Sequence, residues 1–222
     1  MKSQIPAEIL GRIESCGVVA VLVIDEVKHA VPVARALVAG GVDVMELTLR
    51  TPAALGALRS IRAEVPEMLA GIGTILTPAQ VREVVEAHAQ FGVSPGLNPR
   101  VVGTAKEVGL PFAPGVATPS DLEGALELGC RDVKFFPAEP SGGMKYLTSM
   151  AAPYGHLGVR FIPLGGLTAA NMGSYLASPL VSAIGGSWLA TRQIIQAEDW
   201  ETITGNAAEA RKIVGELRST KS

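Results

Sequence analysis

Val133-Lys134-Phe135-Phe136-Pro137 is an apolar stretch interrupted by a single lysine. Apart from Lys134, its short length and its aliphatic and aromatic content are typical of a buried β-strand. Strand-like runs of this kind recur along the whole chain, and their number and spacing decide the fold that the sequence predicts.

We count eight such runs in the sequence. They cover residues 17–24, 42–49, 68–72, 89–94, 111–114, 132–136, 159–164 and 181–184. Their C-terminal ends lie about 23 residues apart on average, which is enough for one strand, one helix and two short loops. Repeated βα units predict a parallel sheet, and eight of them predict an α/β fold of the TIM (β/α)8 barrel type.

The segments between the runs carry helix-start signals. A capping side chain precedes a proline at the first helical position in Thr51-Pro52, Thr77-Pro78, Asn98-Pro99 and Thr118-Pro119. Gln80 completes a capping box with Thr77. The order of strands and helices is therefore marked locally along the chain.

Two further helices are expected outside the repeating units. Residues 6–15 predict an additional N-terminal helix that covers the barrel floor, and residues 207–218 predict a closing outer helix. We find no linker, low-complexity stretch or change of composition that would divide the chain. The sequence therefore predicts a single (β/α)8 barrel domain over residues 1–222.

Composition restricts the classes of partner. The chain has 222 residues, of which 48% are hydrophobic, and a formal net charge of −2. No lysine- and arginine-rich run suggests a nucleic acid or an anionic membrane as a partner, so a small molecule is favoured. The N-terminus lacks the apolar core of a signal peptide, which indicates a cytoplasmic protein. Cys16 and Cys130 match no metal or redox spacing and are expected to be reduced, structural thiols.

Lys134 is the strongest chemical signal in the sequence. A buried ammonium is costly and tends to lose its proton, and the neutral amine is a nucleophile toward carbonyl groups. A lysine near a strand end can instead extend its charged head into water while its stem packs. If Val133 and Phe135 pack against outer helices, strand alternation directs Lys134 into the barrel mouth.

Glu46 is a second candidate catalytic residue. It lies in the apolar run Val44-Met45-Glu46-Leu47, at the same predicted level of the barrel as Lys134. It could serve as the ion-pair partner that a buried lysine needs. It could also move protons as a general acid and base during imine chemistry, and the two roles are compatible.

Two glycine-rich corners predict a phosphate site. Leu164-Gly165-Gly166-Leu167-Thr168 follows the seventh run, and Ile184-Gly185-Gly186-Ser187-Trp188 follows the eighth. Glycines leave backbone N–H groups uncovered, and loops after strands seven and eight often bind phosphate in this fold. Tight turns also use glycine, but two such corners at these places favour phosphate binding.

Three other strand ends carry polar or pocket-shaping residues. Arg50 could face solvent, but its planar guanidinium also suits a carboxylate or a phosphate. Thr74 could satisfy the local turn, and Ser94-Pro95-Gly96 is most simply a turn that shapes the pocket wall.

The histidines do not cluster at strand ends. His29, His88 and His156 fall in predicted helices or loops, so no metal site is expected and a metal-dependent aldolase is disfavoured. No cofactor is expected either.

The order and spacing of these motifs resemble the 2-keto-3-deoxy-6-phosphogluconate (KDPG)/4-hydroxy-2-oxoglutarate (KHG) aldolase family. The motifs that carry the resemblance are Glu46-Leu47-Thr48-Leu49-Arg50-Thr51, Gly71-Ile72-Gly73-Thr74, Ser94-Pro95-Gly96, Lys134-Phe135-Phe136-Pro137-Ala138-Glu139, Gly165-Gly166 and Gly185-Gly186-Ser187-Trp188. The resemblance runs nearly from end to end of the chain.

The resemblance implies a class I aldolase of the Entner-Doudoroff pathway. Such an enzyme reversibly cleaves KDPG to pyruvate and D-glyceraldehyde 3-phosphate, with a possible side activity on 4-hydroxy-2-oxoglutarate. It also implies an imine on Lys134 and a homotrimer, with Glu46 as general acid and base. The remaining roles that it implies are the pyruvate-end carboxylate site (Arg50 and Thr74), the phosphate site (Gly165, Gly166, Gly186 and Ser187) and the pocket wall (Pro95 and Phe136).

The chain departs from the family pattern in two places. Some relatives carry an arginine near the end of the first strand, where this chain has Val23 and Ile24. Phosphogluconate-type members commonly read Pro-Thr-Gly-Gly at the seventh corner, where this chain reads Pro163-Leu164-Gly165-Gly166. A lost hydroxyl weakens discrimination between C4 epimers, so we expect a looser preference for KDPG over its galactonate epimer.

Other functions compatible with the predicted fold remain open from the residues alone. One is a phosphate-binding barrel isomerase or synthase in which Lys134 acts only electrostatically. Another is a galactonate-epimer-preferring aldolase. A sugar-phosphate sensor would keep the glycine corners without needing both Lys134 and Glu46.

Overall fold

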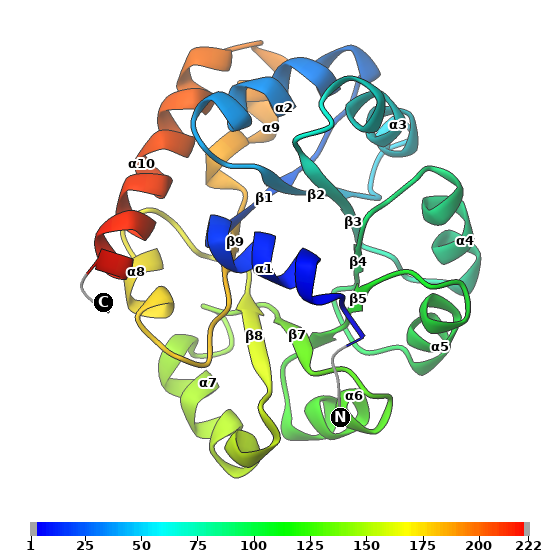
Figure 1. Ribbon diagram of the computed structural model, residues 1–222, viewed down its shortest axis with the longest axis vertical. Coiled ribbons are helices and arrows are strands. Elements are labelled where there is room, and N and C mark those ends of the chain that lie inside the picture. Colours follow the sequence, from blue (N-terminus) through cyan, green and yellow to red (C-terminus); the bar gives the residue numbers. More distant parts are fainter. Residues whose placement is uncertain (1–3, 220–222) are drawn as a thin grey trace.

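Parallel strands form the inner part of the molecule and helices surround them in the computed structural model (Figure 1), which describes residues 4–219. The strands are β1 (Val18–Leu22), β2 (Val44–Thr48), β3 (Leu69–Gly73), β4 (Gly92–Val93), β5 (Phe112–Ala113), β6 (Gly115–Val116), β7 (Asp132–Phe135), β8 (Arg160–Pro163) and β9 (Ile184–Gly186). The ends of the predicted single domain, residues 1–3 and 220–222, lie outside the described residues.

The strands pair in two sheets. One has the order β5-β4-β3-β2-β1-β9 and the other β6-β7-β8. All the ladders are parallel. Isolated parallel bridges between Phe161 and Val181 and between Leu164 and Gly185 link the chain around β8 to the chain around β9. The molecule therefore has an α/β fold with a curled parallel sheet, as the spacing predicted.

Two strands differ from the predicted runs. Residues 111–114 were expected to form one strand, but β5 pairs with β4, β6 pairs with β7, and Pro114 separates them. A proline has no N–H to donate to a ladder, so the pairing changes neighbours there. The predicted run 181–184 overlaps β9 (Ile184–Gly186) only at Ile184. Glycines are rare in strands, so the sequence pattern placed the end of this strand before Gly185.

Ten α-helices lie among residues 4–219. They are α1 (Ala7–Cys16), α2 (Ala30–Ala39), α3 (Ala54–Glu64), α4 (Pro78–Glu86), α5 (Pro99–Glu107), α6 (Pro119–Glu127), α7 (Gly143–Ala151), α8 (Met172–Leu176), α9 (Arg192–Gln196) and α10 (Trp200–Ser219). Three short 3₁₀ helices join them, namely η1 (Val27–His29), η2 (Ala152–Leu157) and η3 (Trp188–Ala190).

Three of the four predicted helix starts are confirmed. Thr77 and Thr118 close capping boxes, and the side chain of Asn98 accepts a hydrogen bond from the Arg100 N–H. The fourth prediction is wrong, because α3 begins only at Ala54 and Ala53 provides no side-chain cap. The Thr51 hydroxyl instead donates to the Ile24 carbonyl at 2.5 Å, which ties the β2 end to the β1 end.

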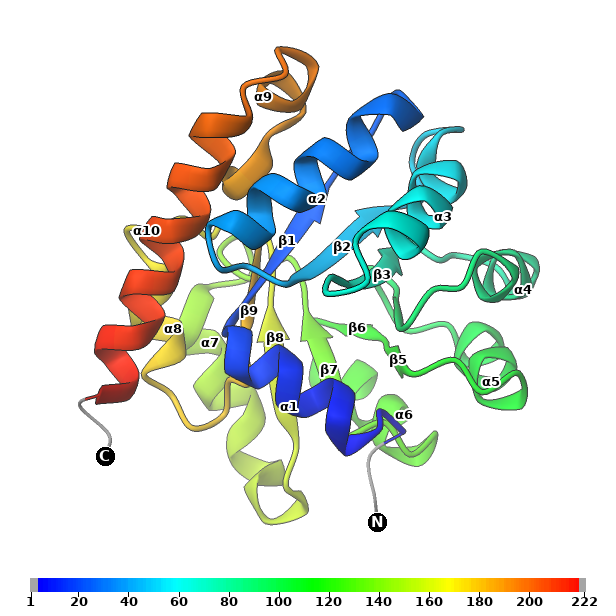
Figure 2. The same cartoon turned by 45° about the horizontal axis from the view of Figure 1, so that its top comes forward.

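The terminal helices are close to their predicted ranges. α1 covers residues 7–16, and Figure 2 shows it across the amino ends of the strands. α10 starts seven residues before the predicted 207–218, because Asp199 caps it by accepting hydrogen bonds from the Thr202 N–H at 3.0 Å and hydroxyl at 2.6 Å. No helix within residues 4–219 is long and apolar enough to cross a membrane.

Burial is almost complete along the strands, as expected for parallel strands covered on both faces. All five residues of β2 and of β3 are buried. Cys16 and Cys130 are buried and form no disulfide. Burial raises the pKa of Cys130 to about 11, which keeps its thiol protonated and unreactive. Against this apolar background, buried Glu46 and Lys134 stand out.

Candidate active site

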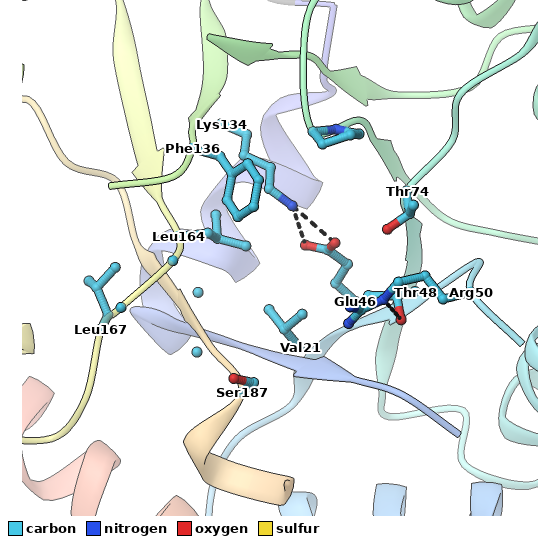
Figure 3. A pocket seen from close by; sticks show the side chains of 15 residues that line it. Val21, Glu46, Thr48, Arg50, Thr74, Lys134, Phe136, Leu164, Leu167 and Ser187 are labelled. Carbon is cyan, nitrogen blue, oxygen red and sulfur yellow. Dashed lines mark hydrogen bonds and ion pairs between the residues drawn. The ribbon is translucent and has the colours of Figure 1, made fainter. Parts of the chain in front are cut away.

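A pocket of about 200 Å³ opens at the carboxyl ends of the strands (Figure 3). All ten predicted site residues line it, namely Glu46, Arg50, Thr74, Pro95, Lys134, Phe136, Gly165, Gly166, Gly186 and Ser187. Five further residues complete the wall, namely Val21, Thr48, Leu164, Leu167 and Gly185. The structure thus brings the predicted residues together, whereas the role of each stays a prediction.

Lys134 and Glu46 form a buried pair in this pocket. Nζ of Lys134 lies 3.1 Å from Oε1 and 3.4 Å from Oε2 of Glu46. Only 6% of Lys134 and 2% of Glu46 is exposed. Nζ also lies 5.2 Å from the centre of the Phe136 ring. The amine therefore lies beside a carboxylate and an aromatic ring and is largely shielded from solvent.

The strand ladder explains why the Glu46 carboxylate fits there. In the ladder between β2 and β3, Glu46 is opposite Gly71 and Thr48 is opposite Gly73. A Cβ on Gly73 would lie only 1.7 Å from Oε1 of Glu46. Gly73 therefore leaves the space that the carboxylate occupies, and a side chain at this position would collide with Glu46.

Arg50 is held at the mouth of the pocket by a buried threonine. The Thr48 hydroxyl donates to the Leu22 carbonyl at 2.9 Å and accepts from Nε of Arg50 at 3.1 Å. The Arg50 residue itself is exposed. Since Nε is bonded to Thr48, the guanidinium plane has a defined orientation, and a planar guanidinium suits a carboxylate.

The glycine corner after β8 lies at the opposite side of the pocket from Arg50. Gly165 and Gly166 have φ angles of 98° and 83°, which only glycine adopts without strain. The Leu164 carbonyl accepts from the Ala138 N–H at 2.7 Å, and the Gly165 carbonyl accepts from the Glu139 N–H at 3.0 Å. The loop after β7 thus fixes the corner after β8.

The corner after β9 requires its glycines for packing. A Cβ on Gly185 would lie 2.4 Å from Cγ of Leu164, and one on Gly186 would overlap the Trp188 ring at 1.5 Å. Ser187 follows directly and is exposed. In Figure 3 the Lys134 and Glu46 pair lies between Arg50 on one side and Ser187 on the other. The pocket therefore has a cationic end at Arg50 and an end lined by the two glycine corners.

The comparisons with known proteins agree with this geometry. Residues 9–205 match the family model described as Aldolase: KDPG and KHG aldolase. This chain belongs to that family. The KHG/KDPG aldolase of Escherichia coli K12 is 48% identical over 193 residues, which cover 87% of this chain and 90% of the relative. The predictions of an aldolase, and hence of a lyase, are confirmed.

Solved structures of two aldolases are also similar to this chain. The Legionella pneumophila KDPG aldolase, with pyruvate captured at low pH as a covalent carbinolamine intermediate, superposes with a TM-score of 0.87 and 37% identity. The match covers 91% of this chain and 97% of the Legionella chain. The Zymomonas mobilis ZM4 aldolase with 3-phosphoglycerate gives a TM-score of 0.84 at 40% identity, covering 92% and 95%.

Sequence reasoning missed some residues that line the site of this aldolase. Thr48 is two residues after Glu46 on β2, so strand alternation alone would have placed both on one face. Val21 and Leu167 carry no chemical signal in the sequence, because an apolar pocket wall and an apolar core look the same.

Gly73→Ala tests the steric argument. The added methyl group collides with the Glu46 carboxylate and should displace it from Lys134, and a displacement of about 1 Å costs on the order of 10²-fold in rate. We therefore expect about a 10²-fold loss of kcat in an aldol-cleavage assay. Gly103→Ala is the matched control, because nothing lies within 4 Å of a Cβ there. Equal activity of the two variants would contradict the steric role.

Proposed function

We propose that this aldolase reversibly cleaves KDPG to pyruvate and D-glyceraldehyde 3-phosphate through an imine on Lys134. The observation that carries the proposal is the buried Nζ of Lys134, held 3.1 Å from a buried carboxylate inside the pocket. A desolvated lysine beside a group that can accept its proton is the arrangement that amine nucleophiles need.

Binding would orient the substrate along the pocket. Arg50 and Thr74 hold the carboxylate end, and Gly165, Gly166, Gly186 and Ser187 hold the phosphate end. The keto carbon then lies beside Nζ of Lys134. Fixing both ends of a flexible chain converts binding energy into orientation of the reacting atoms.

The reaction would begin by transfer of a proton from Nζ of Lys134 to Glu46. The free amine attacks the keto carbon C2 and forms a carbinolamine. Glu46 returns a proton to the carbinolamine hydroxyl, which leaves as water, and the nitrogen lone pair completes the C=N bond of the protonated imine. A short Lys134–Glu46 distance suits each of these proton transfers.

Carbon–carbon cleavage would follow from the imine. Glu46 removes the proton of the C4 hydroxyl, the C3–C4 bond breaks, and its electron pair moves into the imine to give an enamine. The aldehyde that leaves is D-glyceraldehyde 3-phosphate. Glu46 then returns the proton to C3, and hydrolysis of the imine releases pyruvate and free Lys134.

The molecules bound to two relatives support this assignment. The Legionella protein carries pyruvate as a covalent carbinolamine, and the Zymomonas protein carries 3-phosphoglycerate. A keto acid bound covalently and a phosphorylated three-carbon acid correspond to the two ends of the proposed substrate. These matches favour a lyase over the alternative of an isomerase or synthase.

The experiment is mass spectrometry after mixing the protein with pyruvate and borohydride. Borohydride reduces an imine to a stable secondary amine, so we expect a reduced pyruvate adduct on the peptide that contains Lys134. An active, folded protein without this adduct would overturn the imine mechanism and favour an electrostatic role for Lys134.

Leu164→Thr tests the expected loose discrimination at C4. Leu164 lines the pocket, is 5% exposed and packs against Gly185. Its aliphatic side chain offers no hydrogen bond to a substrate hydroxyl. A site discriminates strongly only where it hydrogen-bonds. We expect the threonine variant to raise the ratio of kcat/KM for KDPG to that for its galactonate epimer by about tenfold. An unchanged ratio would remove Leu164 as the cause, and a wild-type preference for the epimer would favour the galactonate-type alternative.

The complete architecture is also a proposal. We infer that the two sheets close into a (β/α)8 barrel, because the chain continues from β5 to β6 through Pro114 and two bridges link the chain around β8 and β9. The amino ends would be covered by α1, whose Ile13 lines an apolar cavity beneath Lys134 and Glu46. The expected cytoplasmic location and the homotrimer remain predictions.

A further inference from the structure

A buried tyrosine binds a glutamate beside the glycine corner. Tyr175 lies in α8 and is 1% exposed. Its hydroxyl donates a hydrogen bond to Oε1 of Glu139, in the loop that follows β7. Neither residue lines the pocket. The mechanism proposed above does not use either side chain.

The Glu139 side chain begins directly against the corner. A Cβ on Gly166 would lie 2.7 Å from Cβ and 2.9 Å from Cγ of Glu139. A Cβ on Gly143 would lie 3.2 Å from both Oε1 of Glu139 and the Tyr175 hydroxyl. The stem thus touches the corner after β8, while the carboxylate is turned toward Gly143 and Tyr175.

The charge of Glu139 matters because neither cation among the described pocket-lining residues lies at this corner. Of the described residues that line the pocket, the lysine and arginine are Lys134 and Arg50, and Figure 3 places both away from Ser187. Glycine N–H groups and a hydroxyl would hold the phosphate. A carboxylate that turned toward this end would repel a phosphate. Although Glu139 is exposed to solvent, no cation of the described pocket lining at this end would offset the repulsion.

We infer that Tyr175 is a positioning residue that holds the Glu139 carboxylate away from the phosphate end of the pocket. The inference rests on the proposed function, since it takes the two glycine corners as the phosphate site. Tyr175 would thereby favour phosphorylated substrates without touching them.

The chemistry of Tyr175 suits a permanent hydrogen bond. Burial, and then the hydrogen bond to Glu139, raise the pKa of Tyr175. The phenol therefore stays protonated and remains a donor throughout the pH range in which the enzyme would work. Phenylalanine has the same ring and lacks the hydroxyl, so Tyr175→Phe removes the bond and preserves most of the packing.

The test compares Tyr175→Phe, Glu139→Gln and the double variant. The readouts are KM and kcat for KDPG, and the rate of deuterium exchange into the pyruvate methyl group, which needs Lys134 and Glu46 but no phosphate. For Tyr175→Phe we expect KM for KDPG to rise about tenfold, equivalent to one 1.4 kcal/mol step in binding, with methyl exchange unchanged. Glu139→Gln removes the charge, so KM for KDPG in this single variant should stay within about twofold of the wild-type value. In the double variant, where no charge is left to be released, KM should return to the same range.

Tyr154→Phe is the matched control. The Tyr154 hydroxyl donates to Oε1 of Glu123 at 2.7 Å, and neither residue lines the pocket. This variant therefore loses a similar tyrosine–glutamate bond away from the glycine corners. It should leave KM for KDPG unchanged.

Three results would overturn the inference. One is an unchanged KM for folded Tyr175→Phe. Another is an equal rise in KM for Tyr175→Phe and the double variant, which would indicate a loss of packing. The third is a tenfold rise for Glu139→Gln alone, which is informative even if Tyr175→Phe does not fold. Ser187→Ala separates this failure from that of the phosphate site: if it raises KM for KDPG while Tyr175→Phe does not, the site stands and the positioning role falls.

Discussion

Lys134→Ala is expected to abolish aldol cleavage, with kcat lowered by about 10⁵-fold or more, the scale seen when a catalytic nucleophile is removed. Among the described residues that line the pocket, Lys134 is the sole lysine, so no other side chain of this lining can form the imine. The variant should also lose the pyruvate adduct after borohydride reduction. Steady-state cleavage of KDPG and the mass of the reduced protein measure the two effects.

The control for Lys134→Ala is Lys145→Ala. Lys145 is an exposed lysine in α7, and it does not line the pocket. It should keep full activity and the adduct on the Lys134 peptide. If Lys134→Ala retained more than a few per cent of wild-type turnover while folded, the nucleophilic role of Lys134 would be wrong.

Glu46→Gln is expected to slow turnover by about 10² to 10⁴-fold, the range typical of a lost general acid and base. Glutamine keeps the volume of the side chain and can still accept a hydrogen bond from Lys134, but it cannot take and return protons at neutral pH. Some imine should therefore still form. The measurements are kcat for KDPG, deuterium exchange into the pyruvate methyl group and the yield of the reduced adduct at long times.

The pattern of the three readouts decides the role of Glu46. Exchange should fall as far as kcat, while the final adduct yield falls much less. Asp132→Asn is the control. Asp132 is a buried carboxylate like Glu46, but it lies on β7 and does not line the pocket. If adduct and exchange were both normal in Glu46→Gln, the carboxylate would serve only as the ion-pair partner of Lys134.

The regular part of the fold could be predicted from the sequence because its signals are local. Three capping residues that each precede a proline, together with the spacing of apolar runs, predicted alternating strands and helices, and the structure has them. The failure at Thr51 has a non-local cause. Thr51 looks like a helix cap, but its hydroxyl bonds the Ile24 carbonyl, which is distant in the sequence. A carbonyl brought in by folding can outcompete the residue's own helix start.

The sequence predicted which residues line the candidate site better than it predicted how their side chains are arranged. Parallel strands of this fold present their carboxyl ends at one edge, so strand-end residues such as Lys134 and Arg50 were expected to meet, and they line one pocket. The predicted glycine corners also line it. Thr48 was missed because its role depends on Leu22 and Arg50 together.

What the sequence determined by itself is the order of the strands and helices, the family, and the residue types available for chemistry. These follow from periodicity, capping and motifs, which act over a few residues. Only the tertiary structure decided that Lys134 lies 3.1 Å from Glu46, that Gly73 makes room for that carboxylate, and that Tyr175 bonds Glu139 beside the glycine corner. Each of these contacts joins different strands, helices or loops, and their distances depend on how the whole core packs, which no local pattern encodes.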